Sequence, residues 1–301
     1  MGVWKPATEM GAADSASRVA IIAGGGDIPL YVAETLAEQG RNPFIVAIEG
    51  EADPALYRFE HQVVYPIRPG VLMSILKRVN PSDVVMVGGV KSRPKLRKIR
   101  PDWTTIKVMA RFLPKLRSGD DVLLRGVVEM IEEAGYRVRG VHELVPNLLA
   151  SEGHIAGPRP ASSNRQPIAT AIEGAIALGN LDAGQGCVAI GRRIVALEGA
   201  EGTDAMLERV ARLRAEGRIS GRRGGVLVKL AKPGQELRAD LPTIGVRTVE
   251  NAAAAGLSGI CVHAGRALIA DLDVTCAKAD ELGVFLTGID PETFGEPVDG
   301  E

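Results

Sequence analysis

Short apolar runs alternate with segments of helical spacing along this chain, and that alternation restricts the folds it can adopt. An apolar run at residues 18–23 is followed by a helical segment at 29–39 and a second apolar run at 43–48. A strand, a helix and a strand in this order form a βαβ unit with parallel strands. Because parallel sheets are covered on both faces, the pattern predicts an α/β fold.

The alternation continues in two blocks. In the first block it predicts strands at 62–65 and 84–87 and helices at 71–77, 103–116 and 121–134. In the second block it predicts helices at 168–178, 203–214, 249–255 and 274–282 and strands at 186–190, 194–197, 225–230, 260–263 and 283–286.

The segment between the blocks differs in composition. Residues 150–167 are rich in Gly, Pro and Ser, which is typical of a connector. We therefore predict two α/β domains, at 18–149 and 168–295, of which the N-terminal one is Rossmann-like with a parallel sheet. Residues 1–17 and 296–301 are expected to be a flexible extension and a tail.

Composition and charge exclude several functional classes. The chain has 301 residues, 46% hydrophobic and 24% charged, which is typical of one or two soluble domains. A formal net charge of −1 gives no overall attraction to nucleic acid, so we expect no such partner. With no apolar run long enough to span a bilayer and no apolar core of a signal peptide at its start, the chain is expected to stay in the cytoplasm and meet membranes only peripherally.

The potential soft-metal ligands are scattered. Cys187, Cys261 and Cys276 are odd in number and lie in apolar surroundings, which predicts core residues rather than disulfides or zinc ligands. The 4 histidines show no metal-ligand spacing. We therefore expect no zinc site.

A glycine run, Gly24-Gly25-Gly26, follows the first predicted strand and precedes a predicted helix. A dinucleotide fingerprint has a third glycine where this chain has Pro29, and proline does not allow the same close packing of helix and strand. We interpret the loop first as a phosphate or nucleotide contact at a helix N-terminus. A purely structural tight turn and a nicotinamide site are the alternatives.

Arginine and lysine are frequent in residues 91–100. For most of these side chains a solvated loop is expected, and contact with an anionic leaflet, worth about 1 kcal/mol per cation near the surface, is the alternative. Arg93 is treated separately because it lies nearest to the end of a predicted strand, where α/β proteins place ligands. We predict that Arg93 contacts a ligand.

The segment 232–245 concentrates polar groups between two apolar runs. It carries Lys232, Gln235, Glu236, Arg238 and Asp240. Two carboxylates, two cations and an amide this close together resemble a phosphate-and-metal site on a loop more than a surface turn.

Polar residues also precede two predicted helices. One of Asp120 and Asp121 is a natural N-cap, and Thr203 or Asp204 either caps the following helix or takes part in a site. Asp204 and Asp240 could converge on one divalent cation. Magnesium prefers few protein carboxylates and accepts substrate phosphate oxygens, so two aspartates on separate loops are sufficient.

Four of these segments resemble, in order, the LpxI-type UDP-2,3-diacylglucosamine diphosphatases of lipid A biosynthesis. They are residues 22–26 with Pro29, 119–125, 201–207 and 232–250. The resemblance implies metal-dependent hydrolysis of UDP-2,3-diacylglucosamine to UMP and 2,3-diacylglucosamine 1-phosphate (lipid X), with water attacking the sugar-side phosphorus. It further implies Mg²⁺ or Mn²⁺ as cofactor, a homodimer, and peripheral contact with the cytoplasmic face of the inner membrane.

Roles for single residues follow as hypotheses. Asp240 holds the metal or orients the attacking water, Asp204 assists with the metal, and Thr203 belongs to the catalytic group. The substrate-binding residues that we predict are Gly24, Gly25, Gly26, Arg93, Asp121, Arg125, Lys232, Gln235 and Arg238. Glu236 ranks below Asp240, because the family position is often aspartate and the extra methylene moves the carboxylate oxygens.

Two other classes of function are compatible with parts of the sequence. A nicotinamide-dependent oxidoreductase would use the glycine loop for its cofactor, and a non-catalytic lipid or nucleotide sensor would bind without turnover. Binding of NAD rather than UMP would favour the oxidoreductase. Metal-dependent release of UMP would exclude the sensor.

Overall fold

The computed structural model describes residues 18–65, 68–90, 120–221 and 223–294, with the side chains of 120–123 left undescribed. The chain divides into two compact units. The N-terminal unit extends to Val145 and also contains Arg238–Asp240, whereas the C-terminal unit begins at Pro146 and contains the rest.

The N-terminal unit is built around a parallel sheet of five strands in the order β3-β2-β1-β4-β5. Its elements, with η marking a 3₁₀ helix, are β1 (Val19–Ala23), α1 (Ile28–Glu38), β2 (Pro43–Ile48), η2 (Pro54–Arg58), β3 (Glu60–Val64), α2 (Pro69–Val79), β4 (Asp83–Val87), α4 (Asp120–Glu133), β5 (Val138–Arg139) and α5 (Val141–Leu144).

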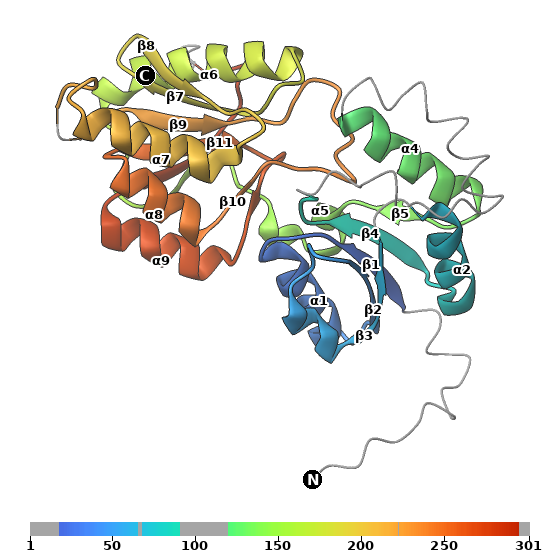
Figure 1. The fold of residues 1–301 in the computed structure, drawn as a ribbon. Helices are drawn as coiled ribbons and strands as arrows, with labels where there is room; N and C mark the ends of the chain where they lie inside the picture. The colour runs from blue at the N-terminus through green and yellow to red at the C-terminus, as the bar shows by residue number, and fades with distance from the viewer. Residues whose placement is uncertain (1–17, 66–67, 91–119, 222, 295–301) are drawn as a thin grey trace. The chain divides into compact units, whose positions relative to one another are not determined.

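Helices cover both faces of this sheet, so its central strands are buried. Every residue of β1 and β4 is buried, as expected for strands with neighbours on both sides and helices on both faces. Alternate side chains such as Ile22 and Phe44 pack with Leu76 of α2 and Ile131 of α4. α1 lies on the opposite face (Figure 1). The structure therefore confirms the predicted parallel α/β architecture of this half.

The C-terminal unit contains a mixed sheet of six strands in the order β6-β13-β11-β9-β7-β8 and a short pair, β10-β12. Its elements are η5 (Pro146–Leu148), β6 (Gly153–Ala156), η6 (Ser162–Asn164), α6 (Arg165–Asn180), β7 (Gly186–Ile190), β8 (Arg193–Leu197), α7 (Gly202–Ala215), β9 (Val226–Lys229), β10 (Thr243–Ile244), α8 (Val246–Ala254), β11 (Gly259–His263), β12 (Leu268–Ile269), α9 (Leu272–Leu282) and β13 (Phe285–Ile289).

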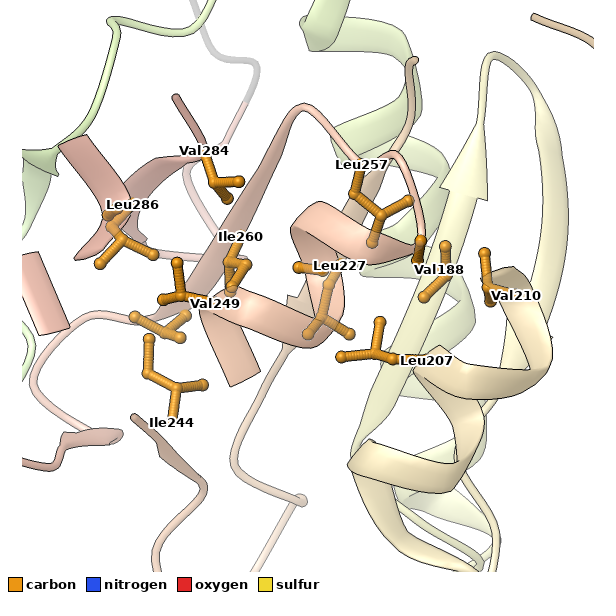
Figure 2. Close-up of a cluster of buried hydrophobic side chains, with 14 of the residues drawn as sticks. Val188, Leu207, Val210, Leu227, Ile244, Val249, Leu257, Ile260, Val284 and Leu286 are labelled. Carbon is orange, nitrogen blue, oxygen red and sulfur yellow. The ribbon is translucent and has the colours of Figure 1, made fainter. Parts of the chain in front are cut away.

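Two apolar cores lie on opposite faces of this sheet. α7, α8 and α9 cover one face, where Leu227 and Ile260 of the strands meet Leu207 of α7 and Val249 of α8 (Figure 2). α6 covers the other face (Figure 1). The predicted core role of Cys187 and Cys261 is confirmed, because both lie buried under α6 and burial raises the pKa of each thiol to about 12. Cys276 is a free cysteine and only partly buried.

The segment expected to be a connector differs from that expectation. Within 150–167 the structure places β6, which pairs antiparallel with β13, and the beginning of α6. The glycine that follows β6, Gly157, packs directly against the backbone of Val284, so a side chain there would collide with it. Glycine at this position therefore allows close packing of the backbone. The division between the two units falls between residues 145 and 146.

One predicted helix, at 103–116, lies outside the described residues. In the described part of the chain, none of the helices combines the length and apolar character needed to cross a membrane.

Candidate functional site

Several strands of the C-terminal sheet end at one edge. β9 is parallel to β11 and β11 to β13, and β8 runs the same way because both β8 and β9 are antiparallel to β7. α7 begins directly beyond β8. Polar groups that bind ligands gather at the carboxyl ends of strands in α/β proteins. The charged residues at this edge are therefore the first candidates for a site in this unit.

Glu198, Thr203 and Lys229 form a connected group at this edge, which we call the polar cluster. Lys229 Nζ donates hydrogen bonds to Thr203 Oγ1 at 2.7 Å and to the carbonyl oxygen of Thr243 at 3.0 Å. Thr203 Oγ1 in turn donates to Glu198 Oε1 at 2.6 Å. Lys229 Nζ lies 4.0 Å from the same oxygen, so the two opposite charges face each other across the threonine hydroxyl.

Both charged members of the cluster are almost completely buried. Lys229 is 7% and Glu198 8% exposed. Glu198 Oε2 is buried and has no hydrogen-bond partner in the described part of the chain. It packs against Gly186, where a methyl group would lie 2.5 Å from it. A buried carboxylate oxygen without a donor is costly, so this group differs from an ordinary core ion pair.

Asp204 follows Thr203 on α7 but has different partners. Its Oδ2 accepts a hydrogen bond from Arg247 Nη2 at 2.6 Å, and its Oδ1 accepts one from Asn251 Nδ2 at 3.0 Å. Arg247 and Asn251 both lie on α8, so the carboxylate links two helices. A divalent cation at Asp204 would have to displace a guanidinium of the same charge sign. A metal role of Asp204 stays a prediction.

No group of three or more His, Cys, Asp or Glu side chains is arranged to hold a metal ion among the described residues. Asp240, the other predicted metal ligand, belongs to the N-terminal unit, whereas Asp204 belongs to the C-terminal unit. Their convergence on one cation therefore stays a prediction.

The polar segment 232–245 is divided between the units. Lys232 Nζ forms an ion pair with Asp182 Oδ1 at 2.7 Å, and the buried side chain of Gln235 accepts a hydrogen bond from the amide of Lys232 at 2.8 Å. Arg238 belongs to the N-terminal unit, where its Nη1 lies 2.6 Å from Glu132 Oε1 of α4. The segment therefore supplies polar side chains to both units.

The glycine run lies where the N-terminal sheet reverses its strand order, between β1 and β4. The amide of Gly24 donates to the carbonyl oxygen of Val87 at 2.9 Å, and Gly25 and Gly89 exchange two hydrogen bonds. A methyl group at Gly24 would lie 2.6 Å from the carbonyl oxygens of Gly88 and Gly89. The crossing of two backbone segments therefore requires glycine at position 24, and a ligand contact there stays a prediction.

Gly26 has a different local role. Its φ of +98° lies in a region that favours glycine, and α1 begins two residues later with Pro29 in its first turn. A phosphate contact at Gly26 and at the N-terminus of α1 stays a prediction. In open α/β sheets, ligands bind beside the point where the strand order reverses.

The structure says less about the remaining predicted site residues. Arg93 lies outside the described residues, and the side chain of Asp121 is also outside them. Arg125 is exposed on α4. The sequence analysis missed Glu198 and Lys229, although each has a recognisable signal: Lys229 interrupts an apolar strand, and Glu198 directly follows one.

Comparisons with known proteins cover almost the whole chain. The LpxI N-terminal domain model matches residues 18–148, and the LpxI C-terminal domain model matches residues 151–287. A relative from Caulobacter vibrioides, UDP-2,3-diacylglucosamine pyrophosphatase LpxI, is 40% identical over 277 residues, which cover 91% of this chain and 98% of the relative.

Solved structures give a weaker comparison. The crystal structure of a protein named gox2253 is 15% identical and covers 89% of this chain and 76% of its own, with a TM-score of 0.34. A putative NAD-dependent epimerase/dehydratase from Methylobacillus flagellatus is 14% identical and covers 95% and 94%, with a TM-score of 0.30. Scores this low support no argument about this chain. The two domain matches and the Caulobacter relative decide the question, and the chain belongs to the LpxI family.

Proposed function

We propose that this protein is a UDP-2,3-diacylglucosamine pyrophosphatase, which hydrolyses the diphosphate bond of its substrate to UMP and lipid X. The observation that carries this proposal is the 40% identity to a relative named for that activity, because the match covers 98% of the relative. This match favours a hydrolase over a nicotinamide-dependent oxidoreductase or a non-catalytic sensor.

The reaction needs positive charge and a placed water molecule. In the proposed step, water oxygen bonds to the sugar-side phosphorus, and the bond from that phosphorus to the bridging oxygen breaks. UMP leaves with the bridging oxygen, and the water gives up a proton. Cations and hydrogen-bond donors that face the phosphate oxygens stabilise the charge that develops. Lys229, Lys232 and Arg238 are the described cations that we propose for this task, and Asp240 orients the water or holds a metal ion.

A divalent ion, Mg²⁺ or Mn²⁺, is proposed from the chemistry of the substrate. When bound, such an ion neutralises phosphate oxygens and lowers the charge barrier to attack. We propose Asp240 as its ligand and assign Asp204 to the link between α7 and α8, where Arg247 and Asn251 each donate a hydrogen bond to it.

Hydrolysis in ¹⁸O-labelled water tests the proposal. Wild-type enzyme is incubated with UDP-2,3-diacylglucosamine and Mg²⁺, with Mn²⁺, or with a chelator, and both products are analysed by mass spectrometry. We expect turnover only with metal and one labelled oxygen in lipid X. Label in UMP would place the attack on the other phosphorus, and absence of turnover under every condition would refute the pyrophosphatase.

The Asp240→Ala variant tests the role of that carboxylate in the same assay. We expect a folded protein that binds the substrate but hydrolyses it at least about 100-fold more slowly, because a group acting at the reacting centre is lost. Circular dichroism checks the fold. Turnover close to wild type would remove Asp240 from the mechanism.

A homodimer and peripheral contact with the cytoplasmic face of the inner membrane are also proposals. Sedimentation velocity tests the oligomeric state, and co-sedimentation with anionic vesicles tests the membrane contact.

A further inference from the structure

We propose that Glu198 is a positioning residue of the pyrophosphatase, which holds the Thr203 hydroxyl and the Lys229 ammonium as one fixed pair that contacts a phosphate group of the substrate. The proposal rests on the proposed function and goes beyond it, because it assigns a positioning role to Glu198 and joins Thr203 and Lys229 into one phosphate contact.

The hydrogen bonds of the cluster have a defined direction. The ammonium of Lys229 donates to Thr203 Oγ1, so the threonine hydroxyl must direct its own proton to another acceptor. That acceptor is Glu198 Oε1, at 2.6 Å. Glu198 therefore fixes the rotation of the hydroxyl and, through it, the position of the ammonium.

Both ends of the cluster keep unused hydrogen-bonding capacity. An ammonium has three N–H groups, and that of Lys229 makes two hydrogen bonds within the described chain, to Thr203 and Thr243. Glu198 Oε1 lies 4.0 Å away, beyond hydrogen-bond distance. One N–H thus remains for a phosphate oxygen. A buried ion pair that served stability alone would be expected to satisfy its donors and acceptors fully.

The position of the cluster matches this role. Lys229 ends β9, Glu198 directly follows β8, and Thr203 lies in the first turn of α7, so all three occupy the carboxyl edge of the sheet. The N-terminus of α7 adds a partial positive charge at this edge. A cation, a hydroxyl and a helix N-terminus are the groups that bind phosphate in proteins. The negative charge of Glu198 would repel a phosphate, so Glu198 contributes by orienting the other two groups rather than by attracting the substrate.

The neighbouring charges do not compete for these atoms. Asp204 is paired with Arg247, and Glu201 is paired with Arg209. Glu201 is exposed on the loop between β8 and α7. It is therefore a matched control for Glu198, three residues away and of the same chemistry.

Three variants test the proposal in the complete enzyme. Glu198→Met keeps a side chain of similar length and removes both carboxylate oxygens, Thr203→Val removes the hydroxyl alone, and the double variant combines them. For each we expect kcat to fall by about 100-fold with KM changed by less than about threefold, because misplaced groups affect the reacting geometry more than substrate binding. Thr203→Ser should retain most of the activity, since it keeps the hydroxyl, and Glu201→Met should be indistinguishable from wild type.

The double variant separates positioning from a merely structural role. If Glu198 acts through Thr203, the double variant is no slower than Thr203→Val, whereas independent effects would multiply. The proposal would be overturned if the kcat losses of the two single variants multiplied in the double variant. It would also be overturned if either single variant kept the wild-type kcat. Thr203→Val leaves both charges in place, so it remains informative if Glu198→Met fails to fold. Wild-type protein without turnover would overturn the proposed function and this inference together, whereas active wild type with active variants would overturn this inference alone.

Discussion

At the scale of single residues, Asp204 illustrates how tertiary contacts change the meaning of a motif. Its position at the start of a helix after a strand is typical of a ligand-binding carboxylate. The structure instead shows both oxygens accepting hydrogen bonds from α8. A carboxylate used in this way links α7 to α8, and a metal ion there would compete with the guanidinium of Arg247.

Replacing Asp204 by Ala should therefore affect stability more than catalysis. Arg247 is largely exposed, with 70% of its side chain accessible, so we expect the free energy of unfolding to fall by only about 1 kcal/mol in urea denaturation. kcat and the Mg²⁺ concentration for half-maximal activity should change by less than about threefold. Arg247→Gln, which breaks the same link from α8, serves as the matched control. A rise of tenfold or more in the Mg²⁺ requirement of Asp204→Ala alone would show that the carboxylate binds metal after all.

At the scale of elements, the glycines beyond β1 and β4 have distinct roles. Gly24 lies so close to the opposite loop that a methyl group would meet the carbonyl oxygen of Gly88 at 2.6 Å. At Gly89, in contrast, an added methyl group meets nothing within 4 Å, and φ is not positive.

These two positions give a matched pair of variants. Gly24→Ala should lower the free energy of unfolding by about 1–3 kcal/mol, because the collision is with backbone that cannot rotate away. Gly89→Ala should lie within about 0.5 kcal/mol of wild type. Both variants are compared with wild type in thermal and urea unfolding. If Gly24→Ala and Gly89→Ala lowered the free energy of unfolding equally, backbone crossing would not be the reason for glycine at position 24.

A charge cluster lies at the other end of the N-terminal sheet, where β4 begins. Its contribution to stability depends on pH. Asp83, at the start of β4, is buried and accepts hydrogen bonds from Arg41 and Arg137. Burial raises the pKa of Asp83, but the hydrogen bonds and charges of Arg41 and Arg137 outweigh burial and bring the pKa below its ordinary value of 3.8. A lowered pKa means that the folded state holds the ionised form more strongly than the unfolded chain does.

Asp83 should thus stabilise the fold at neutral pH and lose this contribution in acid. The contribution is present above the pKa of the unfolded chain, about 3.9, and disappears as pH falls through the lower folded pKa. In urea denaturation, Asp83→Asn should be less stable than wild type by about 2 kcal/mol at pH 7, and the gap should narrow below about pH 4. A gap that stays constant from pH 7 to pH 3 would contradict this assignment.

At the scale of the whole molecule, the chain leaves the C-terminal unit for three residues and then returns. Arg238–Asp240 belong to the N-terminal unit, whereas Leu237 and Leu241 belong to the C-terminal one. Arg238 pairs with Glu132 on α4, and Ala239 packs on the N-terminal core. α4 therefore holds the short segment that contains Asp240.

Weakening this attachment should reduce catalysis more than stability. Both side chains of the pair are about one-third exposed or more, so Glu132→Gln should change the free energy of unfolding by less than about 1 kcal/mol. Because the segment that contains Asp240 is then held less firmly, kcat should fall by about threefold to tenfold. Glu34→Gln, which removes another surface pair of the same unit, should leave kcat unchanged. Equal kcat in the two variants would show that the pair does not position Asp240.

Much of the architecture was predictable because it depends on local periodicity. Apolar runs and helical spacing identified most strands and helices of the described residues to within a few residues, because each of these elements is encoded by its own neighbours in the chain. The four-residue elements β6 and α5 were not predicted. The short strands β5, β10 and β12 were missed, since two residues are too few to show a period. Residue 157 was interpreted as part of a connector, although glycine is needed there because the backbone packs against Val284.

The sequence by itself determined the α/β class, the two-domain organisation and, through four ordered segments, the LpxI family. Only the tertiary structure decided that Lys229 meets Thr203 and Glu198, that Asp204 is engaged by α8, and that Arg238–Asp240 belong with the N-terminal unit. The physical reason is separation along the chain: Lys229 lies 26 residues from Thr203, and Asp204 lies 43 from Arg247. Residues so far apart become neighbours only when burial of apolar faces sets the order and direction of the strands.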